Sequence, residues 1–65
     1  MIKSKLLEIR MREFLMAPGE FANKLNVNLK TYSNWEKGRS KPPLEEAIRI
    51  SKLLNRTVND IWDIE

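Results

Sequence analysis

Apolar residues recur at helical spacing along most of the chain. Between residues 3 and 15 they form a stripe that fits a helix far better than the strict alternation of a strand. The stripe consists of Leu6, Leu7, Ile9, Met11 and Phe14. Phe21 and Leu25 lie four residues apart after Pro18, and proline is tolerated in a first helical turn. The pattern predicts one helix over residues 3–15 and another over residues 18–25.

The rest of the chain predicts three further helices. One is expected over residues 29–37, with Asn28 as its N-cap and Gly38 as its C-terminal stop. The next is expected over residues 44–54. Its core positions are predicted to be Leu44, Ala47, Ile48, Ser51 and Leu54. A short fifth helix covers the segment "TVNDIW", where Thr57 and Asp60 approximate a capping box.

The predicted helices are separated by short connections. Asn26 and Asn55 fall where helices often end in a left-handed residue, a conformation that asparagine tolerates well. The chain carries almost no strand signal, and a domain of 65 residues buries only about 60% of the surface of its unfolded chain. We therefore expect an all-α fold, a compact bundle of five short helices, and a single domain over residues 1–65.

Composition narrows the possible functions. The chain has no cysteine and no histidine, which excludes a disulfide framework and a thiolate metal site and removes the commonest metal ligand and general base. We expect no enzyme activity, no metal and no cofactor. No apolar run approaches the roughly 20 residues that cross a bilayer, so we expect a cytoplasmic protein with no membrane partner. The sequence also gives no sign of a small-molecule effector.

The charge of the chain is unevenly distributed. The net charge is +3, but residues 24–41 contain five basic side chains and one acidic one, a local charge of +4 that leaves −1 for the rest. The basic residues are Lys24, Lys30, Lys37, Arg39 and Lys41. A local basic patch suits a polyanion, although a solvated basic face without a partner would give the same pattern.

Two opposite charges occupy predicted apolar faces. Arg10 lies within the first stripe, and Glu36 follows Tyr32 by four residues, next to Trp35. We expect an Arg10–Glu36 ion pair, partly buried, that joins the first helix to the end of the third. The alternative is two unrelated charges at the rim of the core. Tyr32 and Trp35 are expected in the core, because aromatic residues at helical spacing are usually packing groups.

The order of these features resembles a known family. The tight helix-turn-helix, the "WEKG" that ends its second helix, the loop with Pro42 and the helix "LEEAIRISKLLN" are similar to the phage repressor and Cro type of DNA-binding domain, over about residues 6–62. The resemblance implies a lambda-repressor-like fold with motif helices at about residues 18–25 and 29–37. It also implies a structural ion pair at Arg10 and Glu36.

The resemblance further implies which residues meet double-stranded DNA. The second motif helix of this family lies in the major groove with its N-terminal residues at the base edges. The implied base-contacting residues are Leu29, Lys30, Thr31, Ser33 and Asn34. Asn28, Lys37, Arg39 and Lys41 are assigned to phosphates, which fix orientation rather than sequence.

The chain departs from the family pattern at several positions. Ala17 and Pro18 stand where the family often has Ser or Thr followed by Gln, so the side-chain cap and the glutamine contact to DNA are expected to be missing. The connection between the first two helices is one residue longer than usual. Asn26 replaces the usual glycine of the motif turn, and Pro43 replaces the common capping serine before the fourth helix.

The leading functional hypothesis is a sequence-specific transcriptional regulator, expected to be a repressor that acts by operator occupancy. One recognition helix gives limited specificity, so a homodimer on a two-fold related site is expected, with an interface in the segment 58–64. Trp62 either belongs to that interface or closes the core against the first helix. The alternative function is a protein-interaction module on the same fold, such as an antitoxin or antirepressor. A structural bundle without partners leaves the basic segment unexplained.

Overall fold

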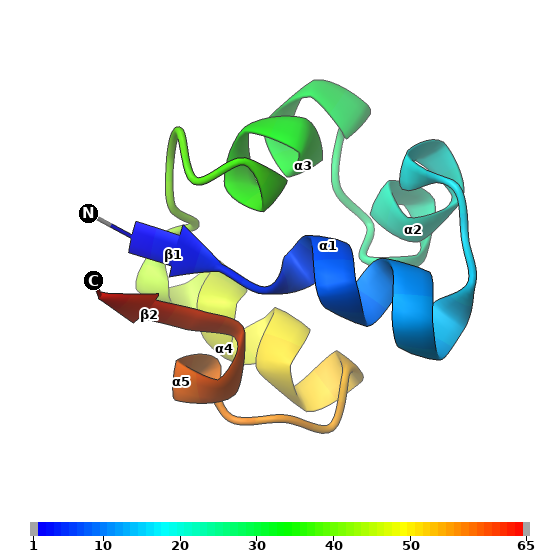
Figure 1. Cartoon of the computed structure of the whole chain (residues 1–65). Coiled ribbons are helices and arrows are strands. Elements are labelled where there is room, and N and C mark those ends of the chain that lie inside the picture. The colour runs from blue at the N-terminus through cyan, green and yellow to red at the C-terminus, as the bar shows by residue number, and fades with distance from the viewer. Residues whose placement is uncertain (1, 65) are drawn as a thin grey trace.

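The computed structural model describes residues 2–64 as five short helices with a small sheet at one end (Figure 1). The first helical segment continues directly from α-helix into π-helix and crosses the middle of the molecule, with α3 on one side of it and α4 and α5 on the other (Figure 1). In chain order the elements are β1 (Ile2–Ser4), α1 (Leu6–Ile9), η1 (Arg10–Phe14), α2 (Pro18–Lys24), α3 (Leu29–Glu36), α4 (Leu44–Leu53), α5 (Val58–Ile61) and β2 (Trp62–Ile64).

The sheet corrects the purely all-α prediction. Strands β1 and β2 pair antiparallel, with Ile2 opposite Ile64 and Ser4 opposite Trp62. Consequently the first helix begins at Leu6 rather than at residue 3, and the fifth helix ends before Trp62. Strands of three residues are too short to show a period-2 pattern, and their pairing joins segments from opposite ends of the chain, which local sequence does not reveal.

A π-helix replaces the end of the first predicted helix. In η1 the carbonyl of Arg10 accepts a hydrogen bond from the N–H of Leu15, five residues later, and Leu15 itself is left-handed with φ 52°. A π-turn takes up one residue more than an α-turn. This insertion accounts for the residue by which the connection to α2 exceeds its expected length. It also turns the Leu15 side chain into solvent, where 83% of its surface is exposed.

Left-handed residues also end α2, α3 and α4, at the three positions where the sequence predicted that a helix stops. Asn26 and Asn55 both have φ 58°, and Gly38 has φ 75°. At Gly38 a Cβ atom would also lie 3.0 Å from the carbonyl oxygen of Ile2. Glycine suits this position for two separate reasons. One is the left-handed φ, and the other is the close approach of β1 to the end of α3.

The predicted N-terminal caps are present. Asn28 Oδ1 accepts hydrogen bonds from the N–H groups of Lys30 at 2.8 Å and Thr31 at 3.4 Å, and so begins α3. At α5, Thr57 and Asp60 cap each other reciprocally, each backbone N–H donating to the other side chain at 3.2 Å. Hydrogen bonding with Thr57 lowers the pKa of Asp60.

The core lies between the helices and extends under the sheet. Its members are Leu6, Ile9, Phe21, Ala22, Leu25, Tyr32, Trp35, Ala47, Ile50, Leu54, Ile61 and Trp62. Three aromatic rings connect the first three helices. Phe14 packs on Phe21 with ring centroids 5.3 Å apart, and Phe21 meets Tyr32 edge-on at 5.6 Å. Trp62 is only 6% exposed, so of the two roles considered for it, the structure shows the core role.

Two predicted core stripes are confirmed only in part. Leu6 and Ile9 are buried in the first, and Ala47, Ser51 and Leu54 in the one on α4. On the first helix, Leu7 and Met11 are 42% and 56% exposed, because the buried face passes through Leu6, Ile9 and Arg10. The predicted stripe was too wide, since Leu7 and Met11 lie on one side of the face that contains Arg10.

On α4 the same error has a different cause. Leu44 is 73% exposed and Ile48 41%, whereas Ile50 is fully buried and Ala47 and Ser51 are nearly so. Adjacent apolar residues on one helix differ by about 100° in direction, so two stripes with equally good spacing can coexist.

Within residues 2–64, no helix is long and apolar enough to cross a membrane.

Candidate nucleic-acid interface

Helices α2 and α3 form a tight, well-packed pair. The turn between them contains left-handed Asn26, after which the N–H of Val27 returns to the carbonyl of Ala22 at 2.9 Å. Asn28 then caps α3. Below the turn, the edge-on contact of Phe21 with Tyr32 fixes the two helices against each other. This arrangement presents α3 as an outer helix supported by α2 (Figure 1).

Helix α3 has one buried face and one outer face. Tyr32 is fully buried and Trp35 is 6% exposed, which confirms that both are core residues. Leu29, Lys30 and Thr31 are exposed, whereas Ser33 and Asn34 are half-buried at the side of the helix. Because residues four apart lie one above the other on a helix, Leu29 with Ser33 and Lys30 with Asn34 form two neighbouring rows. All five predicted base-contacting residues therefore lie outside the core.

The basic residues that follow α3 lie on an ordered loop. The carbonyl of Asn34 accepts hydrogen bonds from Arg39 N–H at 2.9 Å and from Ser40 N–H at 3.4 Å. Pro42 is buried and anchors the far end of the loop. Lys37, Arg39 and Lys41 are exposed around this turn.

These basic side chains keep their charge available. Among residues 2–64 the ion pairs are Arg10–Glu36, Arg49–Glu46 and Arg56–Glu13. None of them involves Lys30, Lys37, Arg39 or Lys41. The outer surface of α3 and its loop is therefore a polar face with a positive border, which suits a polyanion.

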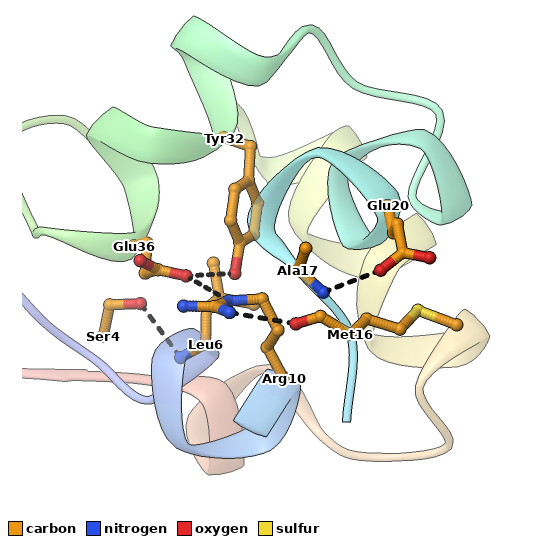
Figure 2. Close-up of polar contacts among 8 residues, drawn as sticks. All are labelled: Ser4, Leu6, Arg10, Met16, Ala17, Glu20, Tyr32 and Glu36. Carbon is orange, nitrogen blue, oxygen red and sulfur yellow. Dashed lines mark hydrogen bonds and ion pairs between the residues drawn. The ribbon is translucent and has the colours of Figure 1, made fainter. Parts of the chain in front are cut away.

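Behind α3, a buried polar network joins three segments of the chain (Figure 2). The predicted ion pair is present, with Arg10 Nε 2.9 Å from Glu36 Oε2 and the two side chains only 11% and 12% exposed. The same carboxylate oxygen accepts the hydroxyl of Tyr32 at 2.5 Å, and Arg10 donates through a second nitrogen to the carbonyl of Met16 at 2.9 Å. The sequence predicted the pair but not its extension to Tyr32 and Met16.

The network shifts the titration of its members. Burial raises the pKa of Tyr32 far above that of an exposed tyrosine, and the hydrogen bond to Glu36 raises it further. Burial alone would lower the pKa of Arg10, but its hydrogen bond and charge interaction with Glu36 outweigh this effect and raise the pKa. Both groups therefore keep their protons over the whole neutral range.

The start of α2 is capped by Glu20, which was not expected from the sequence. Glu20 Oε1 accepts a hydrogen bond from the N–H of Ala17 at 3.0 Å (Figure 2). Ala17 cannot cap with its own side chain, as expected, but a glutamate three residues after an N-cap is one half of a capping box. That spacing was the available signal.

The fold and this surface together define a helix-turn-helix DNA-binding domain. A family model with the description "Helix-turn-helix" matches residues 6–61, which is most of the chain. The chain belongs to this family of Cro/CI-type helix-turn-helix proteins, whose members are DNA-binding transcriptional regulators. A comparison with curated proteins found no match.

Proposed function

We propose that the protein is a sequence-specific transcriptional repressor that acts by occupying its operator, with α3 in the major groove. The observation that supports this proposal most is the outer face of α3. Its exposed Lys30 lies opposite the buried Tyr32 and Trp35, and Leu29 and Thr31 are exposed as well. Basic side chains that form no ion pair within residues 2–64 follow at its C-terminal end. A helix of this kind fits the width of the major groove, and its polar side chains can reach base edges.

Each proposed base contact follows from the chemistry of a side chain. Lys30 can donate to guanine O6 and N7, and Asn34 can pair bidentately with adenine. Leu29, which is 51% exposed, can pack on a thymine methyl group. The hydroxyl groups of Thr31 and Ser33 can donate a hydrogen bond to a base edge or accept one from it.

The proposed phosphate contacts border these residues. Asn28 lies at the positive N-terminal end of α3, where backbone dipoles favour an anion. Lys37, Arg39 and Lys41 lie at its other end. We infer that these four residues set the position of α3 on the duplex, while its central residues read the sequence.

We also propose that the single domain of residues 1–65 binds as a homodimer. One recognition helix reads a short site, and a two-fold related operator presents a second half-site about one helical turn away. Since Trp62 is buried, an interface in the segment 58–64 has to use other groups. Ile64 is 75% exposed there, and Leu44 of α4 is 73% exposed.

Two lysines provide the test of the proposed function. A binding site is first selected from random DNA, and Lys30→Ala and Lys37→Ala are then compared on that site and on altered sites. Lys30→Ala should relax base preference, whereas Lys37→Ala should weaken binding to every duplex by a similar factor and reduce the salt dependence.

Uniform weakening by Lys30→Ala together with a loss of base preference in Lys37→Ala would show that the proposed orientation of α3 on DNA is wrong. Failure of the wild-type protein to shift any duplex at low salt would overturn the DNA-binding proposal. That result would favour the protein-interaction alternative.

A further inference from the structure

The hydroxyl of Tyr32 occupies a special position behind the outer face of α3. Its ring is fully buried, and its hydroxyl donates to the carboxylate oxygen of Glu36 that also accepts Arg10 (Figure 2). Tyr32 lies between Thr31 and Ser33 in the chain, in the middle of the proposed base-contacting segment. Glu36, by contrast, is the last residue of α3. Tyr32 therefore extends the polar network from the end of α3 into its centre.

The other end of the network holds the segment that leads into α2. Arg10 donates through its second nitrogen to the carbonyl of Met16, and its own carbonyl accepts a longer bond from Met16 N–H at 3.4 Å. Main chain and side chain of one arginine thus both bond to Met16. The left-handed Leu15 makes this possible, because it turns the chain back toward Arg10 after η1. Met16 immediately precedes Ala17, the N-cap of α2.

This network gives the contact of α3 with η1 and with the segment before α2 a direction that apolar packing lacks. Phe21 and the other core residues hold α3 in place, but apolar attraction is non-directional and tolerates small rotations. Hydrogen bonds weaken steeply when their angles change. With side chains, a helix has a radius of about 5–6 Å, so a rotation of about 10° about its axis moves the tips of its outer side chains by about 1 Å. Such a shift is enough to misalign a bidentate base contact.

We propose that the Tyr32 hydroxyl is a positioning group for base recognition. It holds the carboxylate of Glu36, one turn further along the same helix, in the orientation that accepts Arg10. The bonds of Arg10 to Glu36 and to the carbonyl of Met16 then fix the rotation of α3 about its own axis relative to η1 and the segment before α2. Tyr32 does not touch DNA itself and acts through the residues on either side of it. This inference rests on the proposed DNA-binding function and adds a residue that determines specificity from inside the core.

The test compares Tyr32→Phe with a matched core variant, Ile50→Val. The first removes only the hydroxyl from a ring that still packs on Phe21. The second removes one methyl group from a fully buried residue of α4 that takes no part in the network. Each variant loses one small interaction, so we expect both to be folded and moderately less stable. Affinities are measured for the selected duplex and for duplexes with single base-pair changes, at a temperature where all proteins are folded.

Tyr32→Phe should reduce the ratio of affinities between the selected duplex and the altered duplexes by about fivefold or more, which lies within the discrimination that one well-aligned bidentate contact provides. The salt dependence of binding should not change, because no phosphate contact is lost. Ile50→Val should leave both properties as in the wild type.

Equal ratios for Tyr32→Phe and the wild type would overturn the inference and leave Tyr32 a packing residue. An equal reduction in both variants would overturn it as well, because reduced stability would then explain the effect. If the wild-type protein shows no base preference at all, the proposed function fails together with the inference. The base preference of the wild-type protein therefore distinguishes a failure of the proposed function from a failure of the inference on Tyr32 alone.

Discussion

Glu36→Ala removes the carboxylate on which the buried network converges. The substitution leaves the guanidinium of Arg10 about nine-tenths buried without a counter-charge, and it leaves the hydroxyl of Tyr32 without its acceptor. Breaking a buried ion pair by removing one partner costs about 3–5 kcal/mol. A domain of 65 residues has a total stability of roughly 3–10 kcal/mol. We therefore expect Glu36→Ala to lose about 3–5 kcal/mol, a third or more of the free energy of unfolding.

Urea denaturation followed by tryptophan fluorescence measures this loss. Glu36→Gln is the informative companion, because an amide oxygen can still accept from Arg10 and Tyr32 while the charge is gone. It should cost less, about 1–3 kcal/mol, the range of a hydrogen bond to a charged group. Arg10→Ala and the double variant complete a cycle. The double variant should lose less than the two single losses together, by about 1–3 kcal/mol, because the groups interact directly.

A surface ion pair of the same residue types serves as the control. Arg49 and Glu46 form two hydrogen bonds on α4, but both side chains are 38% exposed. Glu46→Ala should change the urea midpoint little, since exposed pairs contribute little to stability. The reasoning would be refuted if Glu36→Ala were as mild as Glu46→Ala, or if the losses of the two single variants at Arg10 and Glu36 simply added.

Three further outcomes are expected from denaturation measurements. Leu15→Gly should stabilise the protein by about 0.5–1 kcal/mol. It removes the cost of a left-handed L-residue, about 1–2 kcal/mol, and this is only partly offset by the extra chain entropy that glycine loses on folding, roughly 0.4–1 kcal/mol. A destabilised variant would contradict this. Gly38→Ala should destabilise it by at least about 1 kcal/mol, since φ is 75° and a Cβ atom would press on the carbonyl of Ile2; an unchanged urea midpoint would show that β1 moves away freely. The raised pKa of Tyr32 predicts that the free energy of unfolding falls above about pH 10, where the tyrosine of the unfolded chain ionises first. The stability that this group contributes is present below that pH and is lost as the pH rises toward the pKa of the folded state. Tyr32→Phe should lose less stability than the wild type over the same pH range.

The sequence predicted the helix-turn-helix itself because several local signals agreed there. Asn26 and Gly38 are suited to left-handed turns, Asn28 is a good cap, and Tyr32 and Trp35 repeat at helical spacing. The ion pair was also predictable, since a charge inside an apolar stripe needs a partner and the chain offers few candidates.

Other features were not predictable because they depend on tertiary contacts. The pairing of β1 with β2 joins segments about 60 residues apart, and each strand has only three residues. The π-helix at η1 has no residue pattern of its own and follows from the length of the connection to α2. The third member of the polar network, Tyr32, looked like any other core aromatic. Its hydrogen bond to Glu36 is not a tertiary contact, because the two residues are four apart on one helix, and that spacing was the available signal.

The most direct test of the central claim, that α3 and its following loop bind DNA, is a titration of the isotope-labelled protein with its selected duplex, followed by the backbone amide NMR signals. The largest changes should fall on residues 28–34 and 37–41, and the exposed surface of α4 and α5 away from the sheet should change little. Changes centred on α4 and α5, with residues 28–34 unaffected, would contradict the claim.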